Sequence, residues 1–129
     1  MGIVLIVGGV YQGKLSYAMK RFNAAESDVY RADDVNTDIP CGKKIIYEVD
    51  RWILAMIKAD INVSDAVKKF AAVNADAVVI CNDISCGVVP VDPVMRKWRD
   101  EVGRAMAMLT DEAAEVVRLF CGIPQCISR

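Results

Sequence analysis

The sequence predicts an α/β domain with a mostly parallel sheet and helices on both of its faces. Two continuous apolar runs, residues 2–7 and 76–81, are typical of strands that are buried on both faces of a parallel sheet. Helical spacing of apolar residues follows the first run and separates the later strands, and such alternation favours right-handed parallel crossovers. Because 129 residues is the usual length of one domain, we predict a single domain over residues 1–129.

The remaining elements follow in chain order. Apolar residues at helical spacing predict a helix over residues 14–25, and a short strand over 28–31 precedes a polar loop over 32–43. Residues 44–48 predict a strand that leads into a helix through Ile57. Ser64 is the expected cap of a helix to about Asn74, and Asp92-Pro93 opens a helix to about Leu109 after a loop over 82–91. A strand over 115–121, closed by Gly122 and Pro124, is the last expected element.

Composition excludes several classes of function. With 16 basic and 17 acidic residues, the formal net charge of −1 argues against nucleic-acid binding driven by charge. No apolar run approaches the roughly 18 residues of a membrane span, and the first run is too short for a signal peptide, so we expect no membrane contact and a cytoplasmic location. The chain contains no histidine, which removes every mechanism that needs an imidazole base, nucleophile or metal ligand.

The five cysteines include no CxxC pair. We expect free thiols in a reducing compartment, with Cys81 and Cys121 in the core. The CxxxxC spacings of Cys81/Cys86 and Cys121/Cys126 fit a four-thiolate zinc site poorly, because structural zinc sites use closer pairs.

The principal motif is a glycine-rich loop between the first strand and the first helix. Residues 8–14 match the GxxxxGK pattern of a phosphate-binding P-loop, in the strand–loop–helix context that this motif requires. Glycines let successive backbone N–H groups face one anion, and the helix N-terminus adds its dipole. The motif predicts that phosphates contact the following residues: Gly8, Gly9, Val10, Tyr11, Gln12, Gly13, Lys14 and Leu15. A plain glycine turn is the alternative interpretation.

One position departs from the motif. A P-loop carries Ser or Thr after its lysine, and that hydroxyl binds Mg²⁺. Here the position holds Leu15, and Ser16 is rotated by about 100° on a helix. A water molecule could take the vacant position, because Mg²⁺ keeps several waters. The departure therefore affects the predicted catalysis more than the predicted binding.

Two carboxylates are candidates for the Mg²⁺ site. Asp83 follows the second apolar strand, where a P-loop protein places an acidic residue that holds the metal or orients water. Glu48 ends the expected third strand. Turn formation by Asn82-Asp83 and an ordinary solvated helix carboxylate at position 48 are the alternatives. Lys14 and Asp83 are the predicted catalytic residues, and Asp83 and Glu48 the predicted metal ligands.

The basic residues of the helix after Asp92 have two interpretations. Arg96, Lys97, Arg99 and Arg104 are interrupted by Asp100 and Glu101, which favours a solvated helix face over a nucleic-acid surface. One of these cations could still reach a phosphate.

Two stretches resemble the bifunctional adenosylcobinamide kinase/adenosylcobinamide-phosphate guanylyltransferase family of cobalamin biosynthesis. Residues 3–18 are similar to that family's strand followed by GGxxSGKSxxA. Residues 78–90, 96–104 and 114–122 are similar to its NEVGxGxVP strand, its FRDxxGRxNQxLA helix and its closing ADEVxLVVxG strand. The resemblance covers residues 2–24 and 76–123 and, less clearly, Glu48.

The resemblance implies a RecA-like P-loop NTPase fold, a homotrimer and a GTP- or ATP-dependent transferase that uses Mg²⁺. It gives the loop glycines and Lys14 the nucleotide phosphates, and Asp83 the role of the family's acidic residue. The family transfers GMP through a guanylylated histidine, whose segment is missing here, so we expect no guanylyltransferase activity. The family's Asn-Gln pair is Ala105-Met106 in this chain.

Three functions remain open at this point, and the last of them is a domain that has lost nucleotide binding and persists as a subunit of a complex. The first is a shortened nucleotide-binding kinase that phosphorylates the aminopropanol hydroxyl of a corrinoid such as adenosylcobinamide. The second is a non-catalytic nucleotide- or corrinoid-binding subunit that regulates or scaffolds a complex.

Overall fold

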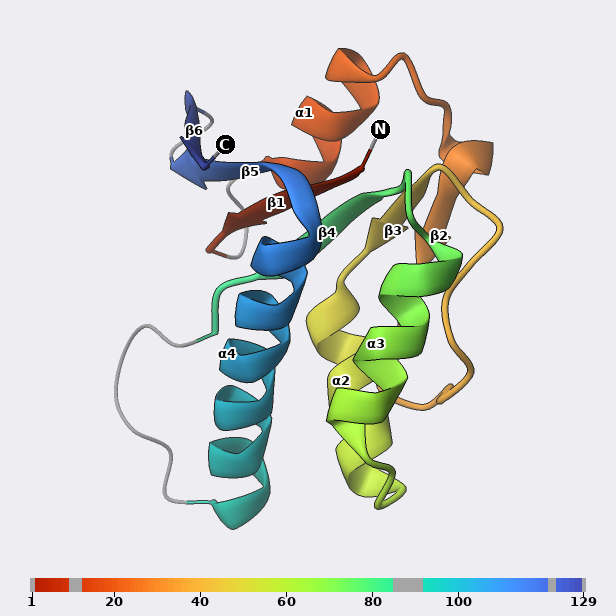
Figure 1. Cartoon of the computed structure of the whole chain (residues 1–129), viewed down its shortest axis with the longest axis vertical. Coiled ribbons are helices and arrows are strands. Elements are labelled where there is room, and N and C mark those ends of the chain that lie inside the picture. The colour runs from red at the N-terminus through yellow and green to blue at the C-terminus, as the bar shows by residue number, and fades with distance from the viewer. Residues whose placement is uncertain (1, 10–12, 85–91, 121–122, 129) are drawn as a thin grey trace.

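The computed structural model describes residues 2–9, 13–84, 92–120 and 123–128 (Figure 1). These residues form six strands, four α-helices and a short 3₁₀-helix. In chain order the elements are β1 Ile3–Gly8, α1 Lys14–Arg21, η1 Glu26–Asp28, β2 Val29–Arg31, β3 Ile45–Tyr47, α2 Val49–Lys58, α3 Val63–Val73, β4 Val78–Asn82, α4 Pro93–Glu112, β5 Ala113–Phe120 and β6 Ile123–Ser128.

The sheet has the strand order β2-β3-β4-β1-β5-β6. Every neighbouring pair is parallel except β5 and β6, which pair antiparallel. The register of β1 and β4 places Gly8 beside Asn82. The start of the glycine-rich loop therefore lies next to the carboxyl end of β4, the edge where ligands bind in open α/β sheets.

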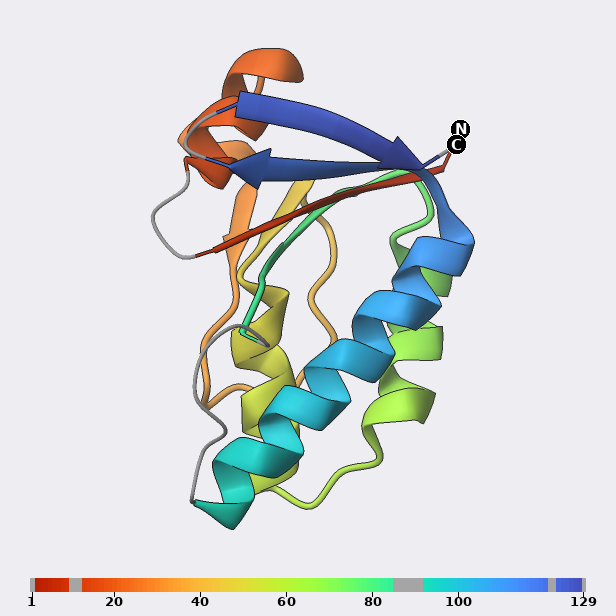
Figure 2. The same ribbon diagram turned by 90° about the vertical axis from the view of Figure 1, so that its left-hand side faces the viewer.

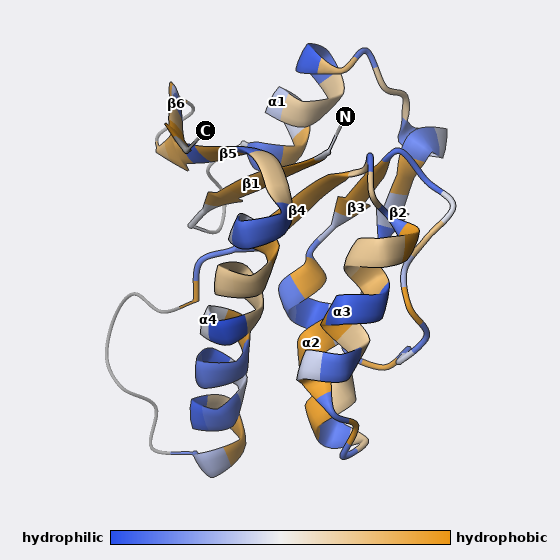
Figure 3. Ribbon diagram, viewed as in Figure 1, coloured by the Kyte–Doolittle hydropathy of each residue, from blue (hydrophilic) through white to orange (hydrophobic). Residues whose placement is uncertain are grey.

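The helices cover both faces of the sheet, which confirms the predicted α/β class. Figure 2 shows α1 on one side of the sheet and α2, α3 and α4 on the other. Alternate residues of β1 supply the two cores: Leu5 and Val7 pack toward α2–α4, whereas Ile6 packs toward α1. A strand with two buried faces needs the continuous apolar run seen in the sequence, and Figure 3 shows that hydrophobicity along the central strands.

The core between α2 and α3 also fixes the long loop before β3. The ring of Trp52 on α2 lies 5.3 Å from that of Phe70 on α3, centroid to centroid. Trp52 Nε1 donates to the carbonyl oxygen of Thr37 at 3.2 Å, and Asn74 Nδ2 donates to that of Pro40 at 2.8 Å. Both residues are buried, so the loop backbone satisfies polar side-chain groups that water does not reach.

Several boundaries differ from the sequence prediction. The first helix ends at Arg21 rather than Ala25, and α4 extends to Glu112. The last strand, β6, was missed because its Pro124 and exposed residues look like a chain terminus, whereas an edge strand tolerates proline. Strand followed by helix over 44–57 is confirmed, and so is Asp92 as the cap of α4, whose carboxylate accepts from the Val94 amide at 2.8 Å.

For the described residues, the structure tests the predicted burial of the cysteines and the predicted lack of a membrane span. Cys81 is buried as expected, Cys41 and Cys126 are exposed, and the predictions for Cys86 and Cys121 lie outside the described residues. Within the described ranges, no helix combines the length and hydrophobicity needed to cross a membrane.

The cap of α3 provides a test of the fold. The prediction of Ser64 as cap was wrong, because Asn62 is the N-cap and its Oδ1 accepts from the Asp65 amide at 3.0 Å. We expect Asn62→Ala to lower the free energy of unfolding by about 1 kcal/mol, since it leaves that amide without its side-chain acceptor. Urea denaturation measures the change. Ser64→Ala is the matched control, and a larger loss in the control than in Asn62→Ala would contradict this assignment of the cap.

Candidate functional site

Two glycines are structurally required around the loop that joins β1 to α1. Gly13 is the N-cap of α1 and has a φ of 79°, a left-handed conformation that a residue with a Cβ rarely adopts. A Cβ on Gly8 would lie 2.6 Å from the carbonyl oxygen of Leu119, so only glycine lets β1 approach β5 here. Val10, Tyr11 and Gln12 lie outside the described residues. At both described ends of the loop, the backbone therefore adopts a geometry that glycine allows and other residues rarely adopt.

Lys14 is the first residue of α1, and it is only 4% exposed. Its Nζ donates a hydrogen bond to the carbonyl oxygen of Gly9. Desolvation by burial lowers the pKa of Lys14, and the negative charges of Asp50 and Glu48 oppose that shift. The ammonium group is therefore held inside the protein rather than in solvent.

A cavity of about 680 Å³ opens beside Lys14. Its walls come from the start of α1, the junction of β3 and α2, the end of β4 and the start of α4. The lining residues are Gly13, Lys14, Leu15, Ser16, Tyr47, Glu48, Asp50, Arg51, Leu54, Asn82, Ile84, Met95 and Trp98. Among the predicted site residues, the fold thus brings Gly13, Lys14, Leu15 and Glu48 to one cavity.

Asp50 is a buried carboxylate at the wall of this cavity, and it is 1% exposed. Its Oδ1 accepts from the Asn82 amide at 3.0 Å, and its Oδ2 accepts from Asn82 Nδ2 at 3.3 Å. Trp98 Nε1 on α4 donates to the Asp50 carbonyl oxygen at 2.7 Å. Desolvation raises the pKa of Asp50, and the hydrogen bonds from Asn82 oppose the shift. Three elements, α2, β4 and α4, are joined at this residue.

The sequence interpretation missed Asp50, although a signal was present. Asp50 stands three, four and seven residues before Ile53, Leu54 and Ile57, so it occupies an apolar stripe of α2. A carboxylate in such a stripe is uncommon and often marks a functional site.

Glu48 lies at the N-cap position of α2 with a φ of 59°, which is unusual for a residue other than glycine. Its side chain is 27% exposed, and Oε2 lies 3.5 Å from Nε of Arg51. Backbone conformations of this kind concentrate at functional sites. Glu48 thus presents a carboxylate to the cavity that a cation could reach.

The cavity offers a partial donor set for Mg²⁺. The Glu48 carboxylate and the Ser16 side chain belong to its lining, whereas both carboxylate oxygens of Asp50 accept from Asn82. Across the described residues, no cluster of three His, Cys, Asp or Glu side chains could hold a metal ion. Since Mg²⁺ usually binds through one or two carboxylates together with substrate phosphates, the donors fit a metal that arrives with a nucleotide.

Asp83 does not line this cavity. Its amide donates to the carbonyl oxygen of Gly8 at 2.8 Å, which continues the ladder from β4 to β1. Its Oδ2 lies 3.9 Å from Nη2 of Arg118 on β5. Asp83 lines instead a neighbouring cavity of about 200 Å³. The predicted pair of metal ligands, Asp83 and Glu48, is therefore divided between two cavities.

Comparison with known proteins identifies part of this chain. The family model described as cobinamide kinase / cobinamide phosphate guanyltransferase matches residues 43–127, which run from before β3 into β6. The match includes Glu48, Asp50, Asn82 and Trp98, and the glycine-rich loop lies before it. No curated protein matches the chain. Both reactions in the family's description transfer a group from a nucleotide, so the match indicates a nucleotide-binding transferase of cobalamin biosynthesis.

The burial of Asp50 predicts a specific pH dependence. Its pKa is higher in the folded chain than the ordinary 3.8, so the folded state binds this proton more tightly. The resulting stabilisation is present below the ordinary pKa and is lost as pH rises through the raised one. We therefore expect Asp50→Asn, which keeps one oxygen for the Asn82 amide, to become more stable relative to wild type as pH rises above 4. Urea denaturation between pH 4 and 7 measures the difference.

Asp65→Asn, which removes an exposed carboxylate on α3, controls for the loss of one acidic group. A stability difference for Asp50→Asn that falls as pH rises would contradict the assigned cause.

Proposed function

Because the chain belongs to the cobinamide kinase / cobinamide phosphate guanyltransferase family, we propose that it binds GTP or ATP at the cavity beside Lys14 and acts as a cobinamide kinase-like phosphotransferase. The observation that carries the proposal is the buried Lys14 ammonium at the N-terminus of α1, next to a cavity large enough for a nucleotide's phosphates. Burial of an ammonium group costs stability, and a phosphate ligand would offset this cost.

Electrostatics at the start of α1 favour an anion. The first turn of α1 contains no acidic residue, and Lys20 and Arg21 lie in its last turn. The N-terminal end of the helix dipole therefore faces the loop without a carboxylate to oppose a phosphate. During phosphate transfer, negative charge spreads over the phosphoryl group. This charge would be neutralised by the amides of the glycine-rich loop, by the N-terminus of α1 and by Lys14.

The remaining cavity wall is suited to the acceptor. Trp98, Met95 and Leu54 supply an apolar surface, and Glu48 and Asn82 supply polar groups. In the proposed reaction the oxygen of an acceptor hydroxyl, such as that of a corrinoid aminopropanol arm, attacks the γ-phosphorus, and the hydroxyl proton passes to solvent. The bond from the γ-phosphorus to the bridging oxygen breaks, and the nucleoside diphosphate leaves. Mg²⁺ held by Glu48 would neutralise phosphate charge, and we assign this role to Glu48 rather than to Asp83.

The proposal excludes a guanylyl-histidine intermediate, because this chain contains no histidine. A homo-oligomer remains a prediction from the resemblance.

One observation favours the non-catalytic alternative. Leu15 lines the cavity where a P-loop protein places the Mg²⁺-binding hydroxyl, and the neighbouring Ser16 also belongs to the lining. A protein that binds nucleotide without positioning the metal would regulate or scaffold rather than transfer phosphate.

Substitution of Lys14 tests nucleotide binding. We expect Lys14→Ala to weaken GTP or ATP binding roughly 10- to 100-fold, since it removes a charge-assisted contact with phosphate. Isothermal titration with each nucleotide, with and without Mg²⁺, measures the affinity. Lys20→Ala, an exposed lysine on the same helix, is the control and should bind as wild type does. Equal affinities of Lys14→Ala and wild type would refute the site, and phosphate transfer to adenosylcobinamide would separate a kinase from a binding subunit.

Substitution of Leu15 tests whether a hydroxyl at this position would bind Mg²⁺. We expect Leu15→Ser to tighten binding of the Mg²⁺-nucleotide by about tenfold relative to nucleotide alone, because the new hydroxyl supplies a metal ligand. The ratio of affinities with and without Mg²⁺ is the readout. Leu15→Ala controls for the loss of the leucine side chain, and the same ratio in both variants would exclude a metal-binding role for this position.

A further inference from the structure

A second cavity lies at the carboxyl ends of β4, β1 and β5, against α4. Its volume is about 200 Å³, and its lining contains Arg99, Arg118 and Asp83 as charged residues. Asn82 and Ile84 line both this cavity and the larger one beside Lys14. The two cavities are therefore neighbours that share one wall.

The cations of this second cavity exceed its anions. Nη2 of Arg118 lies 3.9 Å from Oδ2 of Asp83, beyond the roughly 2.7–2.9 Å of a charge-assisted hydrogen bond. Arg99 is half-buried, and within the described part of the chain it forms no ion pair. Each guanidinium carries five N–H donors, so two arginines beside one carboxylate retain donors for an additional anion.

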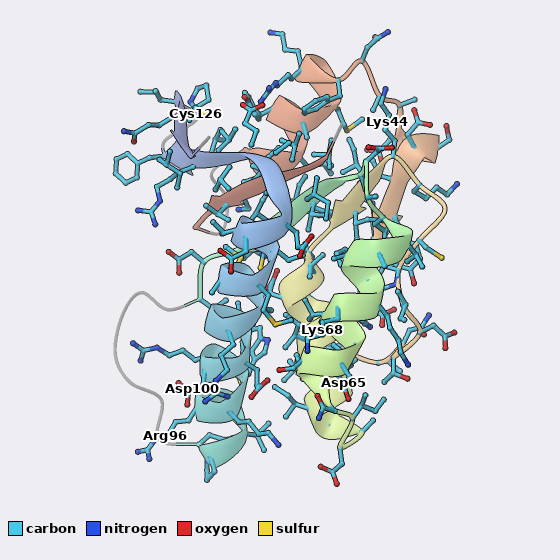
Figure 4. All side chains as sticks on the ribbon, in the orientation of Figure 1. Lys44, Asp65, Lys68, Arg96, Asp100 and Cys126 are labelled. Carbon is cyan, nitrogen blue, oxygen red and sulfur yellow. The ribbon has the colours of Figure 1, made fainter. Side chains whose placement is uncertain are left out.

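Other cations of α4 have a different environment. Arg96 and Asp100 lie along the exposed side of α4 (Figure 4). Arg104 is exposed, and its Nη1 lies 2.6 Å from Oε1 of Glu101. The solvated helix face that the sequence predicted therefore holds for these residues, whereas Arg99 lines a cavity. The sequence could not make this distinction, because it depends on where β4 and β5 end.

We propose that Arg99 and Arg118 form a second anion site, which binds a phosphate group carried by the second substrate or product of this protein. Guanidinium groups match the geometry of a phosphate in a bidentate manner. Val7, Val102 and Met106 supply an apolar wall, and Arg118, whose side chain is 54% exposed, lies on the solvent side of the cavity. The assignment to a second substrate or product depends on the proposed phosphotransfer, whereas anion binding by the two arginines does not.

Asp83 has a defined part in this site. Its carboxylate neutralises some of the arginine charge when the site is empty and competes with a phosphate for Arg118. A substitution that removes its charge should therefore increase phosphate affinity. A purely structural ion pair between Asp83 and Arg118 would not produce this increase.

Inorganic phosphate is the probe, and Lys14→Ala is the background, so that phosphate bound at the glycine-rich loop does not obscure the result. We expect isothermal titration to detect millimolar binding in this background, and Arg99→Gln or Arg118→Gln to weaken it about tenfold. Arg104→Gln, which changes an exposed arginine on α4, should have no effect. Asp83→Asn should tighten binding several-fold.

Substitution of Gly103 tests whether phosphate binding needs the space of the cavity as well as its charges. A Cβ on Gly103 meets no atom within 4 Å, and the residue lines the cavity from α4. Gly103→Leu should reduce phosphate affinity by filling the cavity while all charges remain, and circular dichroism would verify that each variant is folded.

The outcomes separate this inference from the proposed function. Phosphate binding that depends on Arg99 and Arg118 but persists in Lys14→Ala supports the second site even if no nucleotide binds. The inference is overturned if phosphate fails to bind in the Lys14→Ala background, or if its binding ignores both arginine substitutions. A third outcome would also overturn the inference: nucleotide displaces phosphate from the wild type, and neither arginine substitution changes phosphate binding. Phosphate would then bind at the glycine-rich loop alone.

Discussion

The strand β1 has no exposed face, and this constraint organises the rest of the molecule. Its side chains enter one core with α2–α4 and another with α1, while β4 and β5 flank it in parallel. Gly8 allows the close approach to β5, and Gly13 allows the turn into α1. The candidate site is therefore built where β1, a strand with two buried faces, ends.

Two buried ionisable groups, Lys14 and Asp50, share the resulting cavity. Burial lowers the pKa of Lys14, which the negative charge of Asp50 opposes, and burial raises the pKa of Asp50, which the hydrogen bonds from Asn82 oppose. The Asp50 carboxylate also binds the Asn82 amide and side chain, so it fixes β4 against α2. Burial of ionisable groups costs stability, and strongly shifted pKa values in a cavity often mark a functional site.

The sequence predicted much of the fold because its strongest signals are local. Apolar runs identified β1 and β4, Asp92-Pro93 identified the start of α4, and the glycine spacing identified the loop. The sequence prediction was wrong for exposed segments, where apolar residues do not recur at helix or strand spacing. Asn62 and Ser64 are equally plausible caps by residue type, and β6 has no buried run to reveal it. The role of Asp83 as a metal ligand stays a prediction, and the structure places this residue in the cavity that Arg118 also lines.

The sequence alone determined the α/β class, the loop with its lysine and the absence of histidine chemistry, since periodicity and residue type are properties of the chain itself. The tertiary structure decided which carboxylates share a cavity with Lys14, because Glu48 and Asp50 lie at the start of α2 whereas Asp83 follows β4. It also separated Arg99 from the exposed arginines of α4. Such distinctions depend on contacts between segments far apart in sequence, and no local pattern records them.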